Sequence, residues 1–299
     1  MSSQPERTRL IVASLAALKA AGTPITMVTA YDFPSARVAE EAGVDVVLVG
    51  DSAATTVLGH DSTVPVGMAE MLMLAAAVRR GLRTPLLVAD LPFGSYERSD
   101  DLAVDNAQRF LKEAGADAVK LERGGTSVAR ARALVAAGIP VMGHVGLTPQ
   151  TAGQLGGYKA QGRTASAAAR IAEEALALQE AGCFAVVLEA IPAAVTERLM
   201  PYLRIPVIGI GAGPATDGQV LVFHDLLGLL QGHTPRFVRR YAELREPMVR
   251  AVARYAADVR AGEFPGPEHT YGMPATELTA FEKFLDQAGG PGQPGARLG

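Results

Sequence analysis

The sequence is poor in the residues that would assign it to several functional classes. Its one cysteine, Cys183, excludes an intramolecular disulfide and a cysteine-based zinc cluster, and we expect a small buried side chain there. The 28 basic and 31 acidic residues give a net charge of −3, without the positive excess of nucleic-acid-binding proteins. Apolar runs such as 71–78 are far shorter than the roughly 20 residues that span a bilayer. We therefore expect neither nucleic-acid nor membrane partners.

The two ends of the chain also carry few apolar residues. The opening MSSQPERTRL has no positive-then-apolar order and no cleavage pattern, so we expect no export signal and a cytoplasmic location. The closing GGPGQPGARLG is rich in glycine and proline and nearly free of apolar side chains, which predicts a flexible tail.

The chain does contain enough apolar residues to form a core. Its hydrophobic fraction of 48% and charged fraction of 20% are ordinary for a globular enzyme and exclude disorder as the main state. One pattern recurs: an Ala- and Glu-rich stretch that favours helix, then Ala-Gly, then a short apolar run. The glycine can adopt the left-handed conformation that ends a helix, and the apolar run suits a strand buried on both faces. The copies are 40–51, 112–122, 135–145 and 179–190.

Strands and helices are predicted to alternate along most of the chain. Further strands are expected at 25–30, 85–89, 205–210 and 219–223, which brings the number to eight. Strands that alternate with helices form a parallel sheet, and eight such units in about 250 residues favour a closed (β/α)₈ barrel of the TIM type. An open doubly wound sheet is the alternative, but no G-x-G-x-x-G follows the first strand. The sequence thus predicts an α/β barrel in a single domain.

The domain boundaries follow from the same pattern. We expect residues 1–262 to form the barrel with an N-terminal lead-in and a C-terminal helix, and 233–260 is helical by composition. Residues 263–299 are interpreted as a C-terminal extension, of which about the last ten residues are disordered.

Acidic residues stand directly after several of the predicted strands. In parallel barrels the carboxyl ends of the strands build the active site. Such acids repel one another unless a bound cation or a retained proton compensates, and oxygen ligands favour Mg²⁺, then Mn²⁺ or Ca²⁺. Single acids often cap helices or pair with arginine, but four at equivalent positions favour a metal site. The strand-end residues are Asp51 with Ser52, Asp90, Glu122, His144 and Glu189.

Other polar features lie near the same end of the predicted barrel. Lys120 shares a strand face with Glu122, so its partner is either that carboxylate or the carboxylate of a substrate. The long loops 53–65 and 146–163 are candidates for binding loops that order around a ligand. The glycines of 209–213 indicate either a phosphate site or only a tight turn.

Eight motifs between residues 23 and 273 give the sequence a family resemblance. In order they are TAYDFPSA (29–36), VGDSAATTVLGHDSTVPV (49–66), ADLPFGSY (89–96), VKLE (119–122), GHVGLTPQ (143–150), GGYKAQGR (156–163), VLEAIP (187–192) and PVIGIGAG (206–213). Their order and spacing resemble those of the ketopantoate hydroxymethyltransferase family. The resemblance implies a (β/α)₈ enzyme that forms a homodecamer of two stacked pentamers. It also implies transfer of a one-carbon unit from 5,10-methylenetetrahydrofolate to 3-methyl-2-oxobutanoate, which gives 2-dehydropantoate for pantothenate and coenzyme A biosynthesis.

The resemblance also assigns roles to individual residues. It implies one Mg²⁺ per subunit at Asp51, Asp90 and Glu122, keto-acid contacts from Asp51, Ser52, Asp90 and Lys120, and Glu189 as the catalytic base. His144 falls at a further substrate-site position. The sequence departs from the family pattern where Arg123 precedes Gly124 and Gly125, so this arginine either pairs with the adjacent ligand or points away.

Three other interpretations compete with this one. Enzymes of the phosphoenolpyruvate mutase and isocitrate lyase type also place acids around Mg²⁺, but the lyases carry a reactive loop cysteine, whereas Cys183 precedes a predicted buried strand. An aldolase that adds free formaldehyde is a second alternative, and an assay without folate separates it. A barrel retained as a scaffold is the third, and it would not need the strand-end acids.

Overall fold

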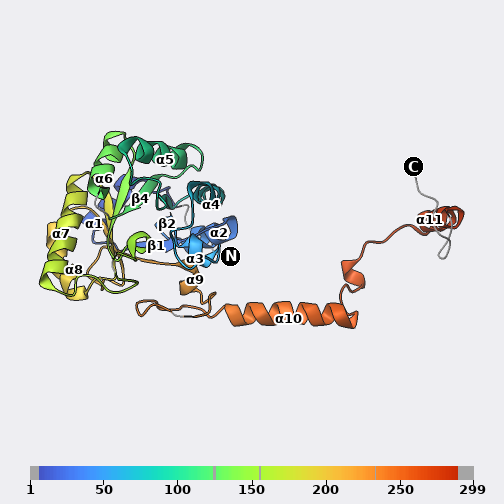
Figure 1. Cartoon of the computed structure of the whole chain (residues 1–299). Helices are drawn as coiled ribbons and strands as arrows, with labels where there is room; N and C mark the ends of the chain where they lie inside the picture. Colours follow the sequence, from blue (N-terminus) through green and yellow to red (C-terminus); the bar gives the residue numbers. More distant parts are fainter. Residues whose placement is uncertain (1–6, 124–125, 155, 233, 289–299) are drawn as a thin grey trace. The chain divides into compact units, whose positions relative to one another are not determined.

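The molecule is built around a closed barrel of eight parallel strands in sequential order (Figure 1). The computed structural model describes residues 7–123, 126–154, 156–232 and 234–288. The strands are β1 (Ile25–Thr29), β2 (Val46–Val49), β3 (Leu86–Asp90), β4 (Ala118–Glu122), β5 (Val141–Gly146), β6 (Ala185–Glu189), β7 (Val207–Ile210) and β8 (Gly218–Leu221). The predicted (β/α)₈ barrel is confirmed, and each of the eight expected strands is present within a few residues of its predicted bounds.

Helices connect the strands and surround the barrel (Figure 1). The glycines of the recurring pattern take positive φ angles of 75°, 69°, 80° and 94° at Gly43, Gly115, Gly138 and Gly182, as predicted for residues that end a helix. The connecting helices are α2 (Phe33–Ala42), α3 (Ala53–Thr56), α4 (Met68–Gly81), α5 (Asp100–Lys112), α6 (Ser127–Ala136), α7 (Ala165–Glu180) and α8 (Ala193–Leu199), with short 3₁₀ turns η1 (Pro149–Thr151) and η2 (Met200–Tyr202).

The core has two layers, one between the strands and the surrounding helices and one inside the barrel. The inner layer contains side chains from every strand, among them Ile25, Val46 and Ala185. Helix α1 (Val12–Ala20) adds Leu15 to this inner layer, where the side chain is fully buried. Leu15 belongs to the same cluster as residues from the starts of the strands, so α1 covers the amino end of the barrel. The polar side chains lie at the opposite, carboxyl end.

The chain beyond β8 differs from the predicted helix over 233–260. Helix α9 (Phe223–Leu226) is short, residues 234–244 are irregular, and the long helix α10 covers only Arg245–Ala261, while His233 lies outside the described residues. Pro235 has no N–H for a helical hydrogen bond. The N–H groups of Tyr241 and Leu244 donate to carbonyls of α9 and the residue after it, so tertiary bonds replace helical ones.

The second compact unit of the chain begins earlier than the predicted boundary at 262. The two units are Met1–Leu244 and Arg245–Gly299. Helix α10 is grouped with the residues after it because they contact one another: the rings of Tyr255 and Phe264 meet edge to face at 5.6 Å. The unit continues through η3 (Pro267–His269) and α11 (Ala275–Gln287), and the predicted disordered end, 289–299, lies outside the described residues. Among the described helices, none has the length and apolar character needed to cross a membrane.

Candidate active site at the carboxyl end of the barrel

A cavity of about 530 Å³ opens at the carboxyl ends of the strands. Every polar residue that the sequence singled out for the site lines it, so the structure brings the whole predicted set together. The acids, the lysine and the histidine are buried, except for Glu189, which is partly exposed together with Ser52. The set is Asp51, Ser52, Asp90, Lys120, Glu122, His144 and Glu189.

Strand geometry explains why these side chains meet. Lys120 and Glu122 lie two residues apart on β4 and both point into the barrel, while Leu121 packs in the outer layer. The parallel register pairs Asp90 with Lys120 and Glu122 with His144 on neighbouring strands. The predicted shared face of β4 is therefore confirmed.

Lys120 is paired with Asp90 rather than with Glu122, its expected partner within the chain. Its Nζ lies 2.8 Å from Asp90 Oδ1. The reason is register, because the neighbouring strand places Asp90 beside Lys120. Burial disfavours the charged ammonium, but the carboxylates of Asp90, Glu122 and Asp51 outweigh burial and raise the pKa of Lys120.

The buried carboxylates carry more negative charge than one lysine balances. Burial raises the pKa of Asp51 well above its ordinary value, and the charges of Glu122 and Asp90 raise it further. Burial also raises the pKa of Asp90, although Lys120 opposes this. Such an excess is the electrostatic condition in which a cation is bound.

His144 lies between two carboxylates on either side of β5. Its Nε2 is 3.1 Å from Glu189 Oε2, and its Nδ1 is 3.5 Å from Glu122 Oε1. Burial and the charge of Lys120 lower the pKa of His144, but the contacts with Glu122 and Glu189 raise it to about 9. The two neighbouring carboxylates therefore favour the protonated form of His144.

Gln150 and Tyr96 belong to the site but were not singled out from the sequence. The buried Gln150 amide donates to Asp51 Oδ2 and to Leu91 O, both at 2.9 Å, and its Oε1 accepts from Tyr96 O–H at 2.7 Å. Gln150 lies in the GHVGLTPQ motif, but the side chains of Gln150 and Tyr96 are uncharged. In the sequence Gln150 is 99 residues from Asp51 and 54 residues from Tyr96. No local spacing rule connects residues so far apart.

Ser52 is oriented by Tyr31, which lies just after β1. Its Oγ lies 2.8 Å from the hydroxyl of Tyr31, whose ring lies 5.4 Å from the ring of His224.

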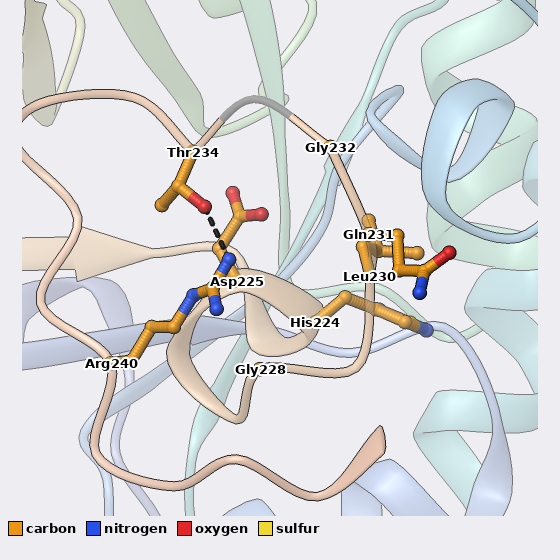
Figure 2. A pocket seen from close by; sticks show the side chains of 8 residues that line it. All are labelled: His224, Asp225, Gly228, Leu230, Gln231, Gly232, Thr234 and Arg240. Carbon is orange, nitrogen blue, oxygen red and sulfur yellow. Dashed lines mark hydrogen bonds between the residues drawn. The ribbon is translucent and has the colours of Figure 1, made fainter. Parts of the chain in front are cut away.

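A small hollow of about 60 Å³ adjoins this region after β8. Figure 2 shows Arg240 directed toward Thr234 there, while the His224 side chain extends to the other side. Asp225 lines both this hollow and the main cavity.

The loops and glycines noted in the sequence have distinct positions. Loop 53–65 lines the cavity through residues such as Thr55 and Thr63, and loop 146–163 does so through Pro149 and Tyr158. The glycine segment 209–213 serves packing: Gly211 has a φ of 64°, and a Cβ there would lie 2.6 Å from Phe237. This contact supports the interpretation of the segment as a tight turn.

Arg123, the departure from the family pattern, points away from the acids. Its guanidinium pairs with Glu174 of α7 at 2.8 Å, and its backbone N–H donates to His144 O. The two glycines that follow, Gly124 and Gly125, lie outside the described residues. The arginine therefore does not pair with Glu122, whose carboxylate faces the cavity.

The carboxylates of Asp51, Asp90 and Glu122 could bind a divalent cation whose remaining ligands come from substrate and water. Protein groups contact both oxygens of Asp90, from the Asp51 N–H and Lys120 Nζ, but only one oxygen of Asp51, from the Gln150 amide. In Glu122 the backbone N–H of Gln150 donates to Oε2, while Oε1 faces the cavity 3.5 Å from His144 Nδ1. Within the described residues, no three His, Cys, Asp or Glu side chains are grouped so that they could hold a metal alone. Mg²⁺ usually takes only one or two protein carboxylates and completes its octahedron with water and substrate.

Comparisons with known proteins identify the family of the chain. Residues 9–267 match the family model described as ketopantoate hydroxymethyltransferase. The chain is 50% identical to 3-methyl-2-oxobutanoate hydroxymethyltransferase of Oleidesulfovibrio alaskensis, over 96% of this chain and 99% of that protein. It is 54% identical to the enzyme of that name from Moorella thermoacetica, over 89% of this chain and 99% of the relative.

Solved structures with the same fold are more distant. Phosphoenolpyruvate phosphomutase from Streptomyces platensis subsp. rosaceus aligns with a TM-score of 0.58 at 17% identity, over 93% of this chain and 98% of that one. A 2,3-dimethylmalate lyase aligns with a TM-score of 0.55 at 19% identity, over 93% and 98%. At these identities the likeness concerns the barrel alone. The family match over most of the sequence shows that the chain belongs to the ketopantoate hydroxymethyltransferase family.

Proposed function

We propose that this protein is an enzyme that transfers a hydroxymethyl group to 3-methyl-2-oxobutanoate, giving 2-dehydropantoate for pantothenate and coenzyme A biosynthesis. One observation carries the proposal: Glu189 faces the buried group of Asp51, Asp90, Lys120 and Glu122 across a single cavity. Proton removal next to a ketone requires a base opposite a site where positive charge, here Lys120 and the proposed metal ion, can stabilise the negative charge that develops. The family match favours this reaction over the mutase, lyase and scaffold interpretations.

The proposed cofactor is one Mg²⁺ per subunit, held by Asp51, Asp90 and Glu122. When bound, the ion supplies Lewis-acid stabilisation of the negative charge that develops on the keto oxygen. Support comes from the excess of buried carboxylates and from the raised pKa values of Asp51 and Asp90. Lys120, paired with Asp90, is a positive charge that this chain itself contributes to the site.

Side chains of the protein bind the keto acid and remove its proton. Lys120 and Ser52 bind the carboxylate of the keto acid, and the Tyr31 hydroxyl orients Ser52. Glu189 removes the proton from the third carbon of 3-methyl-2-oxobutanoate, and His144 holds the Glu189 carboxylate toward it. The resulting enolate carbon forms a bond to the methylene carbon as one of the two carbon–nitrogen bonds to the carrier breaks. Water then replaces the second nitrogen and supplies the hydroxyl oxygen, and the carrier leaves with both nitrogens protonated, by one proton from the keto acid and one from water.

The proposed carrier is 5,10-methylenetetrahydrofolate. The cavity extends beyond the acids to Thr55, Tyr158 and Phe237, which offers space and an apolar surface for a second, larger substrate. Free formaldehyde as the donor is the alternative. An assay with formaldehyde and no folate separates the two, because a folate-dependent enzyme gives no product at comparable rates.

The proposed assembly is a homodecamer located in the cytoplasm, with small molecules as its other partners. An apolar groove of about 960 Å³ along the outside of the barrel, next to β1, α2 and β8, offers a surface that self-association would cover. Sedimentation equilibrium tests this, with a mass near ten times that of the chain expected. A monomer at micromolar concentration would contradict the decamer.

The decisive experiment concerns Glu189. In D₂O with Mg²⁺ and without a one-carbon donor, wild type should exchange the proton at the third carbon of 3-methyl-2-oxobutanoate, as followed by proton NMR. Glu189→Gln keeps the size of the side chain and its contact with His144 but removes the base, so exchange should slow by about 10²–10⁴-fold. Binding of the keto acid, measured by calorimetry, should be retained. Exchange at the wild-type rate in the variant would remove Glu189 from this role.

A further inference from the structure

Gln150 contacts both sides of the acidic group from a single loop position. It lies on η1 directly after β5 and is 5% exposed. Its side-chain amide donates to Asp51 Oδ2, and its backbone N–H donates to Glu122 Oε2, both at 2.9 Å. One residue therefore joins a carboxylate that follows β2 to a carboxylate that ends β4.

These two bonds determine which carboxylate oxygens face a cation. With Oδ2 of Asp51 and Oε2 of Glu122 held by Gln150, the oxygens that remain for a cation are Asp51 Oδ1 and Glu122 Oε1, the latter 3.5 Å from His144 Nδ1. A carboxylate that is held through one oxygen cannot rotate freely, so the other oxygen keeps its direction when the metal site is empty.

The orientation of the Gln150 amide is itself fixed. Its NH₂ group faces two acceptors, Asp51 Oδ2 and Leu91 O, and its oxygen accepts from the Tyr96 hydroxyl. A rotated amide would place its oxygen against a carboxylate and a carbonyl, and would lose the bond from Tyr96. Tyr96 is itself buried, so water does not substitute for this bond.

We propose that Gln150, held in orientation by Tyr96, is a positioning residue that aligns the Asp51 and Glu122 carboxylates for the divalent cation. The inference rests on the proposed function, because it concerns the cation proposed there. It adds two residues to the site that neither the sequence motifs nor the family match assigns a role.

The test measures metal binding directly, without turnover. Mn²⁺ binding to the purified full-length protein is followed by electron paramagnetic resonance of the free ion. Gln150→Ala should weaken Mn²⁺ binding by about 10–100-fold, the usual effect of losing a partner that orients a metal ligand. Tyr96→Phe, which removes only one hydroxyl, should weaken it in the same direction but less. Gln154→Ala, an exposed glutamine on the same loop, is the matched control and should bind Mn²⁺ like wild type.

Steady-state kinetics separate positioning from general damage. In Gln150→Ala and Tyr96→Phe, the Mg²⁺ concentration for half-maximal rate should rise by the same factor as the Mn²⁺ dissociation constant, while kcat at saturating Mg²⁺ stays close to wild type. If wild type binds Mn²⁺ and Tyr96→Phe and Gln150→Ala bind it equally well, the inference is overturned while the proposed function stands. If wild type binds no Mn²⁺ at all, the proposed metal site fails and the inference fails with it.

Discussion

Lys120 is a buried cation whose charge is balanced by carboxylates rather than by water. It is 4% exposed and lies 2.8 Å from Asp90, with Asp51 and Glu122 close enough to raise its pKa. A buried ion pair contributes little net stability compared with an apolar pair, but removal of one partner leaves the other charge uncompensated. Loss of Lys120 would leave the charges of Asp90, Asp51 and Glu122 uncompensated together.

Lys120→Met should therefore destabilise the fold as well as abolish keto-acid binding. We expect the free energy of unfolding to fall by about 3–5 kcal/mol, the usual effect of removing one partner of a buried pair. Urea unfolding followed by circular dichroism measures it. Mg²⁺ should restore part of the loss, because a bound cation would replace some of the missing charge. An unchanged unfolding midpoint without metal would show that the acids do not need the lysine.

The site could be predicted residue by residue only where local rules apply. Asp51, Asp90, Glu122 and Glu189 were found because each one ends a strand or directly follows one, and carboxyl ends meet in a parallel barrel. Of the two partners expected for Lys120, Glu122 was wrong, because the partner within the chain depends on the register between β3 and β4, while the substrate carboxylate stays a prediction. Gln150 and Tyr96 were missed because uncharged side chains reach the site through contacts that sequence distance does not reveal.

At the scale of single elements, helix α2 shows how local chemistry defines a boundary. Asp32 has extended backbone and accepts a hydrogen bond from the Ser35 N–H at 2.7 Å, and Gly43 ends the helix with a φ of 75°. Both ends are therefore specified by residues of the segment itself, the Asp32 side chain at the start and the backbone conformation of Gly43 at the end.

Asp32→Ala should shorten or loosen the first turn of α2. Loss of an N-cap costs about 1 kcal/mol, and up to 2 in unfavourable cases. Thermal and urea unfolding measure the change, and Asp32→Ser, which keeps an acceptor at this position, should recover most of it. A variant with alanine that is as stable as wild type would mean that the bond from Ser35 is replaced by water.

The elements that sequence predicted well are those with such local signals. The eight strands are short apolar runs, several of them preceded by a glycine that ends a helix, and their bounds follow from this pattern. The segment 233–260 has helical composition throughout, yet only Arg245–Ala261 is helical. Contacts made elsewhere decide the remainder: Phe237 packs on Gly211, and the N–H groups of Tyr241 and Leu244 bond to carbonyls after β8.

At the scale of the whole barrel, α1 supplies a side chain that no strand provides. Leu15 is fully buried with residues from the starts of the strands, such as Ile25 and Leu86. The interior below the acids is thus filled by apolar side chains that close the amino end.

Leu15→Ala should leave a cavity at this end and destabilise the whole barrel. Loss of a fully buried leucine costs about 2–5 kcal/mol, depending on how far the neighbours relax. Leu18→Ala on the same helix is the control and should cost less, because Leu18 is only partly buried. Chemical denaturation of both variants gives the comparison. Equal losses would indicate that α1 contributes through its helix as a whole rather than through Leu15.

This closure has a kinetic consequence for two substrates of unequal size. With Leu15 and the apolar layer behind them, Lys120 and the acids form the floor of a blind pocket, and Tyr158 lies nearer to solvent at its opening. A keto acid that binds at the floor has to pass the place where a larger donor would lie. If the proposed function holds, we therefore expect ordered binding: the small acid enters first, the carrier follows, and the elongated acid leaves only after the spent carrier has departed.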